Sequence, residues 1–197
     1  MSVGDRPDTR RCRRSRSECV PVSEVARDPR PPYIAVIGDG EPRGPDAHRI
    51  LEWAEEVGLE LARAGATVVT GGLGGVMEAA SRGARSAGGV TIGILPGADA
   101  SEANEFVSIP IATGLGVVRN LVVVTSANAV VAVGGRHGTL SEIGLALRMG
   151  RHVVALSSWR VESEHRLGGP RVHRVRDPRE AASLALRLAA AAELNGS

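Results

Sequence analysis

The sequence contains no lysine, and all 24 of its basic side chains are arginines. A lysine Schiff base and the pyridoxal phosphate chemistry that depends on it are therefore excluded, as is a Walker A loop, which needs a lysine for the phosphates. Only four residues are aromatic, which is few for a surface that stacks single-stranded nucleic acid. No apolar run approaches the roughly 20 residues of a membrane span. We expect neither a membrane nor a nucleic acid as partner.

Cysteine is also scarce, since Cys12 and Cys19 are the only two and both lie in residues 1–32. This stretch is rich in Arg, Asp, Ser and Pro, and its composition predicts a disordered tail. A basic arm that binds nucleic acid is the alternative interpretation. No further Cys or His lies near the two thiols, so we predict no metal site. A core without cysteine and a start without a secretory apolar segment favour the cytoplasm.

Residues 33–193 alternate between short apolar runs and helical segments, and we expect them to form a single domain. The predicted strands are 33–37, 67–70, 90–95, 129–133, 152–156 and 172–175, with a further extended piece over 106–111. Five helices are predicted. The first is capped by Asp46 and ended by Gly65, and the third lies within 114–126. The others span 76–87, Gly138 to Gly150, and 178–191. This alternation predicts an α/β fold, a doubly wound and mostly parallel Rossmann-like sheet of about six or seven strands with helices on both faces.

Three glycine-rich turns follow predicted strands, after Ile37, Thr70 and Val133. In a parallel sheet these turns share the carboxyl edge, where ligands bind. The third turn opens a helix at Gly138, whose free N–H groups and dipole favour an anion such as a phosphate. No G-x-G-x-x-G follows the first strand, so a dinucleotide cofactor of the usual kind is not expected. Asp39, in the first turn, is a candidate contact for a ribose hydroxyl.

Two of these turns resemble the motifs of the LOG-like family, formerly described as lysine decarboxylases. The first motif, GG-x-x-G-x-M followed by a helix and a GG-x-x-x-G-x-x-P strand, matches residues 71–77 and 88–96. The second, an arginine-bearing helix and then PGG-x-GT-x-x-E, matches Arg119 and residues 134–142. The resemblance covers about residues 33–157. The family includes cytokinin-activating phosphoribohydrolases and molybdenum cofactor carrier proteins.

The resemblance implies a catalytic pair, Arg119 and Glu142, in the family's hydrolases, which cleave the N-glycosidic bond of nucleoside 5′-monophosphates. A carboxylate can stabilise an oxocarbenium-like transition state or direct water, and an arginine can stabilise charge on the ligand. The residues expected to contact a phosphate-bearing ligand are Gly38, Asp39, Gly71, Gly72, Gly75, Met77, Gly134, Gly135, Arg136, Gly138 and Thr139. The resemblance also implies a homo-oligomer, a dimer or tetramer.

The third turn departs from the family pattern, because Gly134 replaces the proline and Arg136 replaces the second glycine. Arg136 either supplies a second phosphate ligand or changes which ligand fits. The segment looks more like the cofactor-carrier branch than like the hydrolases. Simpler roles remain open: Glu142 as a carboxylate favoured by the helix dipole, Arg119 as part of a surface or interface salt bridge, and His137 as a loop residue without a metal.

These patterns rank three functions. The first is binding of a phosphate-bearing nucleotide or a molybdopterin-type cofactor, such as an AMP-like nucleotide or the molybdopterin cofactor itself. The second is hydrolysis of a nucleoside 5′-monophosphate by a phosphoribohydrolase. The third is nucleic-acid binding through the basic tail.

Overall fold

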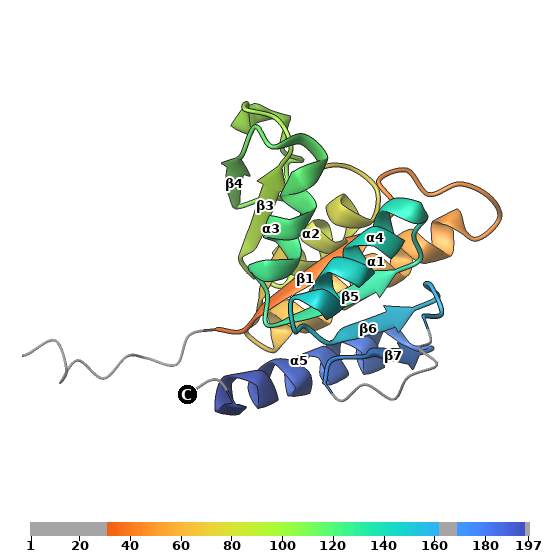
Figure 1. The fold of residues 1–197 in the computed structure, drawn as a ribbon. Coiled ribbons are helices and arrows are strands. Elements are labelled where there is room, and N and C mark those ends of the chain that lie inside the picture. The colour runs from red at the N-terminus through yellow and green to blue at the C-terminus, as the bar shows by residue number, and fades with distance from the viewer. Residues whose placement is uncertain (1–30, 162–168, 196–197) are drawn as a thin grey trace, which may run out of the picture. The chain divides into compact units, whose positions relative to one another are not determined.

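The structure, a computed structural model, describes residues 31–161 and 169–195. The predicted tail lies outside these residues except for its last two prolines, and so do Cys12 and Cys19. Within the described residues the chain forms seven parallel strands, ordered β4-β3-β2-β1-β5-β6-β7 (Figure 1). Their bounds are β1 (Tyr33–Gly38), β2 (Thr67–Thr70), β3 (Thr91–Leu95), β4 (Ile109–Ala112), β5 (Ala129–Val133), β6 (Val153–Leu156) and β7 (Val172–Val175).

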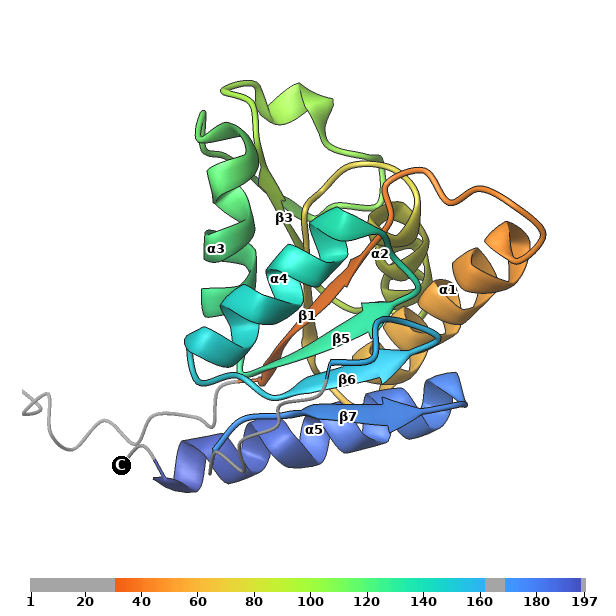
Figure 2. The ribbon, with the colours of Figure 1, turned by 45° about the vertical axis from the view of Figure 1, so that its right-hand side comes forward.

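Helices cover both faces of this sheet (Figures 1 and 2). On one face lie α1 (Ala47–Arg63), α2 (Val76–Ser86) and α5 (Pro178–Asn195), and on the other lie α3 (Arg119–Thr125) and α4 (His137–Arg148). Two short 3₁₀ helices are η2 (Ala100–Glu102) and η3 (Gly116–Val118). The predicted fold class, a doubly wound parallel α/β sheet, is confirmed.

The central strands carry the core, because their side chains alternate between the two helical layers. In β1, Ile34 and Val36 pack with α1, α2 and α5, whereas Ala35 and Ile37 pack with α3 and α4. All five residues of β5 are buried, as expected of a strand covered on both faces. The register pairs Gly38 with the last residue of β5, so both strands end at the same level.

Several element boundaries differ from those predicted. Asp46 precedes α1 but its side chain caps no N–H group; it accepts a hydrogen bond from Arg49 at 2.7 Å instead. The extended piece expected over 106–111 is β4, and it begins only at Ile109. The helix expected within 114–126 starts as η3 and becomes α-helical at Arg119. Helix α4 begins one residue earlier than predicted and α5 extends to Asn195.

The strand order reverses between β1 and β5, because the chain leaves β1 toward β2 on one side and returns to β5 on the other. Such a switch point leaves a crevice at the carboxyl ends of the two strands, since the loops that follow them diverge. The three glycine-rich turns end β1, β2 and β5 at this edge. The fold therefore places the predicted turns around one crevice.

Candidate functional site

A cavity of about 420 Å³ lies at this switch point. Its volume is within the range of small-molecule sites. The cavity is lined by Val36, Ile37, Gly38, Asp39, Gly40, Gly71, Met77, Arg119, Asn120, Arg136, His137, Gly138, Thr139 and Glu142. The lining comes from the ends of β1 and β2, from the starts of α3 and α4, and from α2. We call this space the first cavity.

Arg119 and Glu142 are buried in the wall of the first cavity, with 9% and 6% of their surfaces exposed. Arg119 is the first residue of α3, and Glu142 lies in the second turn of α4, so the pair joins the two helices on one face of the sheet. The Arg119 Nη1 and Glu142 Oε1 atoms are 3.9 Å apart, an ion-pair distance but too long for a hydrogen bond. Arg119 is therefore not an exposed surface residue, and an interface salt bridge stays a prediction.

Burial dominates the electrostatics of this pair. It raises the pKa of Glu142 to about 7, although the nearby Arg119 guanidinium acts to lower it. Burial also lowers the pKa of Arg119, and Glu142 acts in the opposite direction. Glu142 is thus poised to hold or release a proton near neutral pH.

The Arg119 guanidinium has unused hydrogen-bonding capacity. It donates no hydrogen bond to any described residue, and its Nε atom is buried. Gly71 leaves the room that the guanidinium occupies, because a Cβ atom on Gly71 would lie 2.6 Å from both terminal nitrogens. A buried Nε–H donor without a hydrogen-bond partner is unusual in a folded protein. The arrangement suits an anionic ligand in the first cavity.

The N-terminus of α4 faces the same cavity with the first-turn residues His137, Gly138 and Thr139. The first N–H groups of a helix have no partner within the helix, and the helix dipole adds partial positive charge there. A Cβ atom on Gly138 would meet none of the described residues within 4 Å, which leaves room for a ligand beside this residue. Two sources of positive potential, this terminus and Arg119, meet in one cavity.

Arg136 forms a bidentate ion pair with Asp39 across the first cavity. Its Nε atom is 2.6 Å from Asp39 Oδ2, and its Nη2 atom donates to Oδ1 at 3.0 Å. Burial alone would raise the pKa of Asp39, but hydrogen bonds from the Glu41 N–H and from Arg136 outweigh it and hold that pKa below its usual value. Trp159 donates an indole hydrogen bond to the Arg136 carbonyl at 3.0 Å. Asp39 and Arg136, both predicted to contact the ligand, are thus paired with each other.

Seven of the eleven predicted ligand-contact residues line the first cavity, together with both members of the predicted catalytic pair. The other four, Gly72, Gly75, Gly134 and Gly135, do not line it; all have positive φ and shape the turns behind it. Five lining residues were not among the predicted site residues: Val36, Ile37, Gly40, Asn120 and His137. His137, expected to be a loop residue, is the first residue of α4. Asn120 directly follows Arg119 and His137 lies within the matched segment 134–142, so their places beside motif residues were the available signal.

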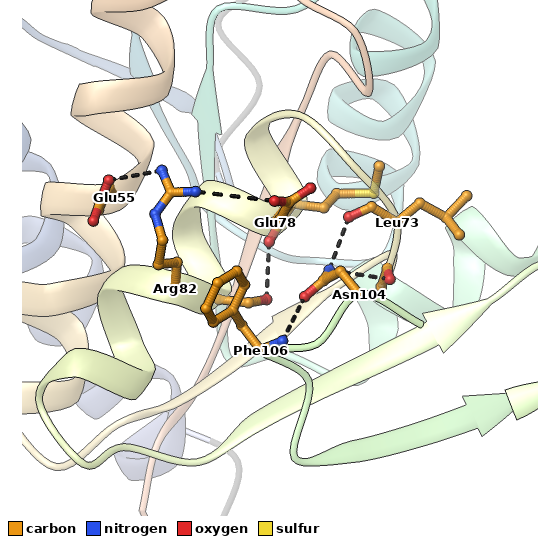
Figure 3. A network of polar contacts seen from close by, with 9 residues as sticks. Glu55, Leu73, Glu78, Arg82, Asn104 and Phe106 are labelled. Carbon is orange, nitrogen blue, oxygen red and sulfur yellow. Dashed lines mark hydrogen bonds and ion pairs between the residues drawn. The ribbon is translucent and has the colours of Figure 1, made fainter. Parts of the chain in front are cut away.

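The turn between β2 and α2 is held from outside by the loop after β3 (Figure 3). The Asn104 side-chain amide donates to the carbonyls of Gly72 and Leu73, at 3.1 and 2.8 Å, and its Oδ1 atom accepts the Phe106 N–H at 3.1 Å. These bonds explain why β4 begins later than predicted, because Phe106 is fixed in the loop. They also fix the turn that leaves room for Arg119.

The match to a family model covers residues 31–182, and the model describes the SLOG cluster4 family. The chain belongs to the SLOG cluster4 family. This confirms the LOG-like resemblance that the two glycine motifs carry.

Among proteins similar to this SLOG cluster4 chain, an uncharacterized protein of Archaeoglobus fulgidus is 45% identical over 123 residues, which are 62% of this chain and 78% of that one. The molybdenum cofactor binding protein from the phototrophic bacterium Rippkaea orientalis has 37% identity and a TM-score of 0.71, over 81% of this chain and 98% of that one. A Moco carrier protein from Chlamydomonas reinhardtii has 39% identity and a TM-score of 0.70, over 82% and 99%.

Two further observations concern the described residues of this SLOG cluster4 chain. They contain no group of three or more His, Cys, Asp or Glu side chains placed to hold a metal ion. Across residues 31–161 and 169–195, the structure has no helix with both the length and the apolar character to cross a bilayer.

Proposed function

We propose that this protein binds a small phosphate-bearing molecule, a nucleotide or a molybdopterin-type cofactor, in the first cavity. One observation carries the proposal: the buried Arg119 guanidinium faces this cavity without a hydrogen-bonded partner among the described residues. Leaving buried donors unsatisfied costs free energy, which an anionic ligand recovers through charge-assisted hydrogen bonds. The similarity to molybdenum cofactor binding and carrier proteins supports the same proposal.

The residues of the first cavity fit a ligand of this kind. The phosphate group would lie at the N-terminus of α4, on the backbone N–H groups of Gly138 and Thr139, within reach of Arg119. A protonated Glu142 would not repel the phosphate, and burial favours that form up to a pH of about 7. In this proposal the molybdopterin cofactor is cargo, held by its phosphate and shielded from solvent.

Thermal unfolding with added AMP or with the molybdopterin cofactor tests the proposal. At a ligand concentration 100 times Kd, binding stabilises the folded state by about 2.7 kcal/mol, which raises Tm by about 5–10 °C in a chain of this size. We expect one of the two ligands to produce such a shift. Failure of both, at concentrations up to millimolar, would contradict the proposal.

Helix α4 offers a matched pair of variants. Gly138 lines the first cavity, Gly144 lies further along the same helix outside it, and a Cβ atom on either would meet open space. Gly138→Leu should place a side chain where the ligand binds and abolish the Tm shift. Gly144→Leu should keep it. Equal ligand-induced Tm shifts in both variants would mean that the ligand binds outside the first cavity.

The alternative function is hydrolysis of a nucleoside 5′-monophosphate, and a specific observation favours it: the buried Glu142 carboxyl, with its pKa near 7, lies beside Arg119 in the cavity wall. Such a group can direct water to an anomeric carbon or stabilise positive charge there. Chromatography of free adenine after incubation with AMP tests it. Adenine release that Glu142→Gln abolishes would make the protein a hydrolase. Absence of release from both proteins would leave the binding function, and release from both would indicate a contaminant.

The remaining expectations stay predictions. The nucleic-acid alternative depends on arginines that lie outside the described residues, and steeply salt-dependent retention on DNA, lost on deletion of residues 1–30, would support it. A dimer or tetramer is expected, and apolar side chains of Leu115, Val117 and Val118 are exposed beside α3. Light scattering of the purified protein would measure the oligomeric state.

A further inference from the structure

A second cavity, of about 340 Å³, lies at the carboxyl ends of β6 and β7 beside the first turn of α1. It is lined by Arg49, Trp53, Ala155, Ser157, Ser158, Arg174, Val175 and Arg176. It shares no lining residue with the first cavity. The turn between β5 and α4 adjoins this region, because the Gly134 N–H binds the Leu156 carbonyl at 3.0 Å and Gly134 packs against Ile50 of α1.

The charged side chains that line the second cavity are three arginines, with no acidic residue among them. Arg174 and Arg176 form no ion pair or hydrogen bond with any other described residue. Asp177, which follows Arg176 directly, is engaged at the start of α5, where its carboxylate accepts two backbone N–H groups. Arg49 has one contact of this kind, at 2.7 Å to Asp46, and both of these side chains are largely exposed. Within residues 31–161 and 169–195, Arg174 and Arg176 therefore bring positive charge to the second cavity that no acidic side chain pairs.

Two further features are typical of a binding site. The Ser158 hydroxyl is buried, and its oxygen has no hydrogen-bond partner within the described part of the chain. Ser157 has a φ of 50°, the left-handed backbone conformation that non-glycine residues seldom adopt; strain of this kind is concentrated at functional sites. The Arg49 guanidinium lies 5.1 Å from the centre of the Trp53 ring, which holds it over that ring.

We propose that the second cavity binds a small anion through a diphosphate group, independently of the first cavity. Guanidinium groups can bind phosphate oxygens bidentately, and the second cavity offers arginines from two elements, α1 and the end of β7, for two linked phosphates. The Ser158 hydroxyl supplies a further hydrogen bond. A diphosphate also brings more negative charge than one phosphate, in keeping with three arginines. Inorganic pyrophosphate and a nucleoside diphosphate share this chemistry.

The chain contains two tryptophans, and each reports on one cavity. Trp53 lines the second cavity, whereas Trp159 donates a hydrogen bond to the carbonyl of Arg136, which lines the first. In a Trp159→Phe background the emission of Trp53 therefore follows the second cavity alone. We expect pyrophosphate, titrated at low ionic strength, to change this emission with saturation. ADP as a second titrant distinguishes the two sources: tighter binding of ADP would indicate that the nucleoside adds contacts, and equal binding that the diphosphate suffices.

The double variant Arg174→Ala/Arg176→Ala should raise the Kd for pyrophosphate at least about tenfold, because it removes two charge-assisted contacts. The matched control is Arg85→Ala/Arg187→Ala, which also removes two exposed arginines but from outside both cavities, and it should leave Kd unchanged. Equal weakening in both double variants, or no saturable change in the parent, overturns the proposal.

Gly138→Leu separates this proposal from the proposed function. This variant closes the first cavity and should leave the pyrophosphate titration unchanged. Loss of the Trp53 signal in it would mean that the anion binds in the first cavity and that the second is not a site. A normal pyrophosphate titration would stand even if neither AMP nor the molybdopterin cofactor bound the first cavity.

Discussion

The two glycine-rich segments that carry the family motifs, one after β2 and one after β5, look alike as sequences. Their glycines have different surroundings in the fold. In the turn between β2 and α2, a Cβ atom on Gly75 would collide with backbone carbonyls of the turn after β1. The same turn is held by the Asn104 side chain. In the first turn of α4, a Cβ atom on Gly138 would meet no described residue within 4 Å. Gly75 is thus packed into the structure, whereas Gly138 opens on the first cavity. Below, the packed turn is the turn that contains Gly75, and the open turn is the first turn of α4, which contains Gly138.

A glycine motif can have two distinct physical uses. A glycine can be required because the folded chain leaves no room for a side chain, or because an empty space is kept for a ligand. The first use contributes to stability and the second to binding. Substitutions that separate stability from binding therefore test the comparison.

The largest effect is expected for Gly75→Ala. Gly75 has a φ of 65° and a ψ of −130°, which disfavours any side chain, and the added Cβ would meet rigid backbone. We expect a loss of more than about 3 kcal/mol in the free energy of unfolding, measured by urea denaturation. Gly138→Ala, the same substitution in the open turn, should change it by less than about 1 kcal/mol, and alanine favours the helix there. Similar losses in the two variants would remove the distinction between the turns.

A smaller effect, dependent on pH, is expected for Glu142→Gln. Because burial raises the pKa of Glu142 to about 7 in the folded protein, the folded state binds this proton more tightly than the unfolded chain does. The wild-type protein should therefore lose stability as pH rises from about 4.5 to about 7, and no more of it above that range. Glutamine cannot ionise, so its stability lacks this dependence on pH. The free energy of unfolding of the variant should exceed that of the wild type by up to about 3 kcal/mol at pH about 8, and by nearly nothing at pH about 4.

Urea denaturation of both proteins across this pH range measures the difference. A variant that is less stable than the wild type by the same amount at every pH would show that Glu142 is charged throughout and held by Arg119. That result would give the ion pair between Arg119 and Glu142 a part in stability.

The smallest effect is expected for Asn104→Ala, which removes the side chain that holds the packed turn. Its loss leaves the carbonyls of Gly72 and Leu73 without these bonds, and we expect a cost of about 2 kcal/mol in thermal or chemical unfolding. Asn120→Ala is the control, because Asn120 lines the first cavity and forms no hydrogen bond with the described residues. An equal cost for both would contradict the comparison.

Local sequence signals predicted most of the fold. The buried strands 67–70 and 129–133 match β2 and β5, because a short β-branched run between glycines has few other interpretations. The register of a parallel sheet then brought the glycine turns to one edge. The exceptions lie where a side chain overrides the local pattern, as at Phe106, whose N–H is held by Asn104, a contact that no periodicity reveals.

The site was predictable only as far as its motifs extend. The resemblance identified Arg119 and Glu142, but the bidentate pair between Arg136 and Asp39 joins residues 97 positions apart, each in a turn without regular spacing. The second cavity gave no signal at all. Arg174 lies in what reads as an ordinary edge strand, and a chain whose basic residues are all arginine makes no single arginine conspicuous.

The central position of β1 also affects how the chain is made. Tyr33, at the start of β1, exchanges hydrogen bonds with Asn128, which lies 95 residues later. At about 5 to 20 residues per second, a ribosome needs about 5 to 20 s to supply this partner. Throughout that interval one edge of the innermost strand has no neighbour, and an uncovered strand edge is a template for unwanted pairing. The strand order that creates the first cavity therefore also gives the nascent chain its longest exposure to aggregation.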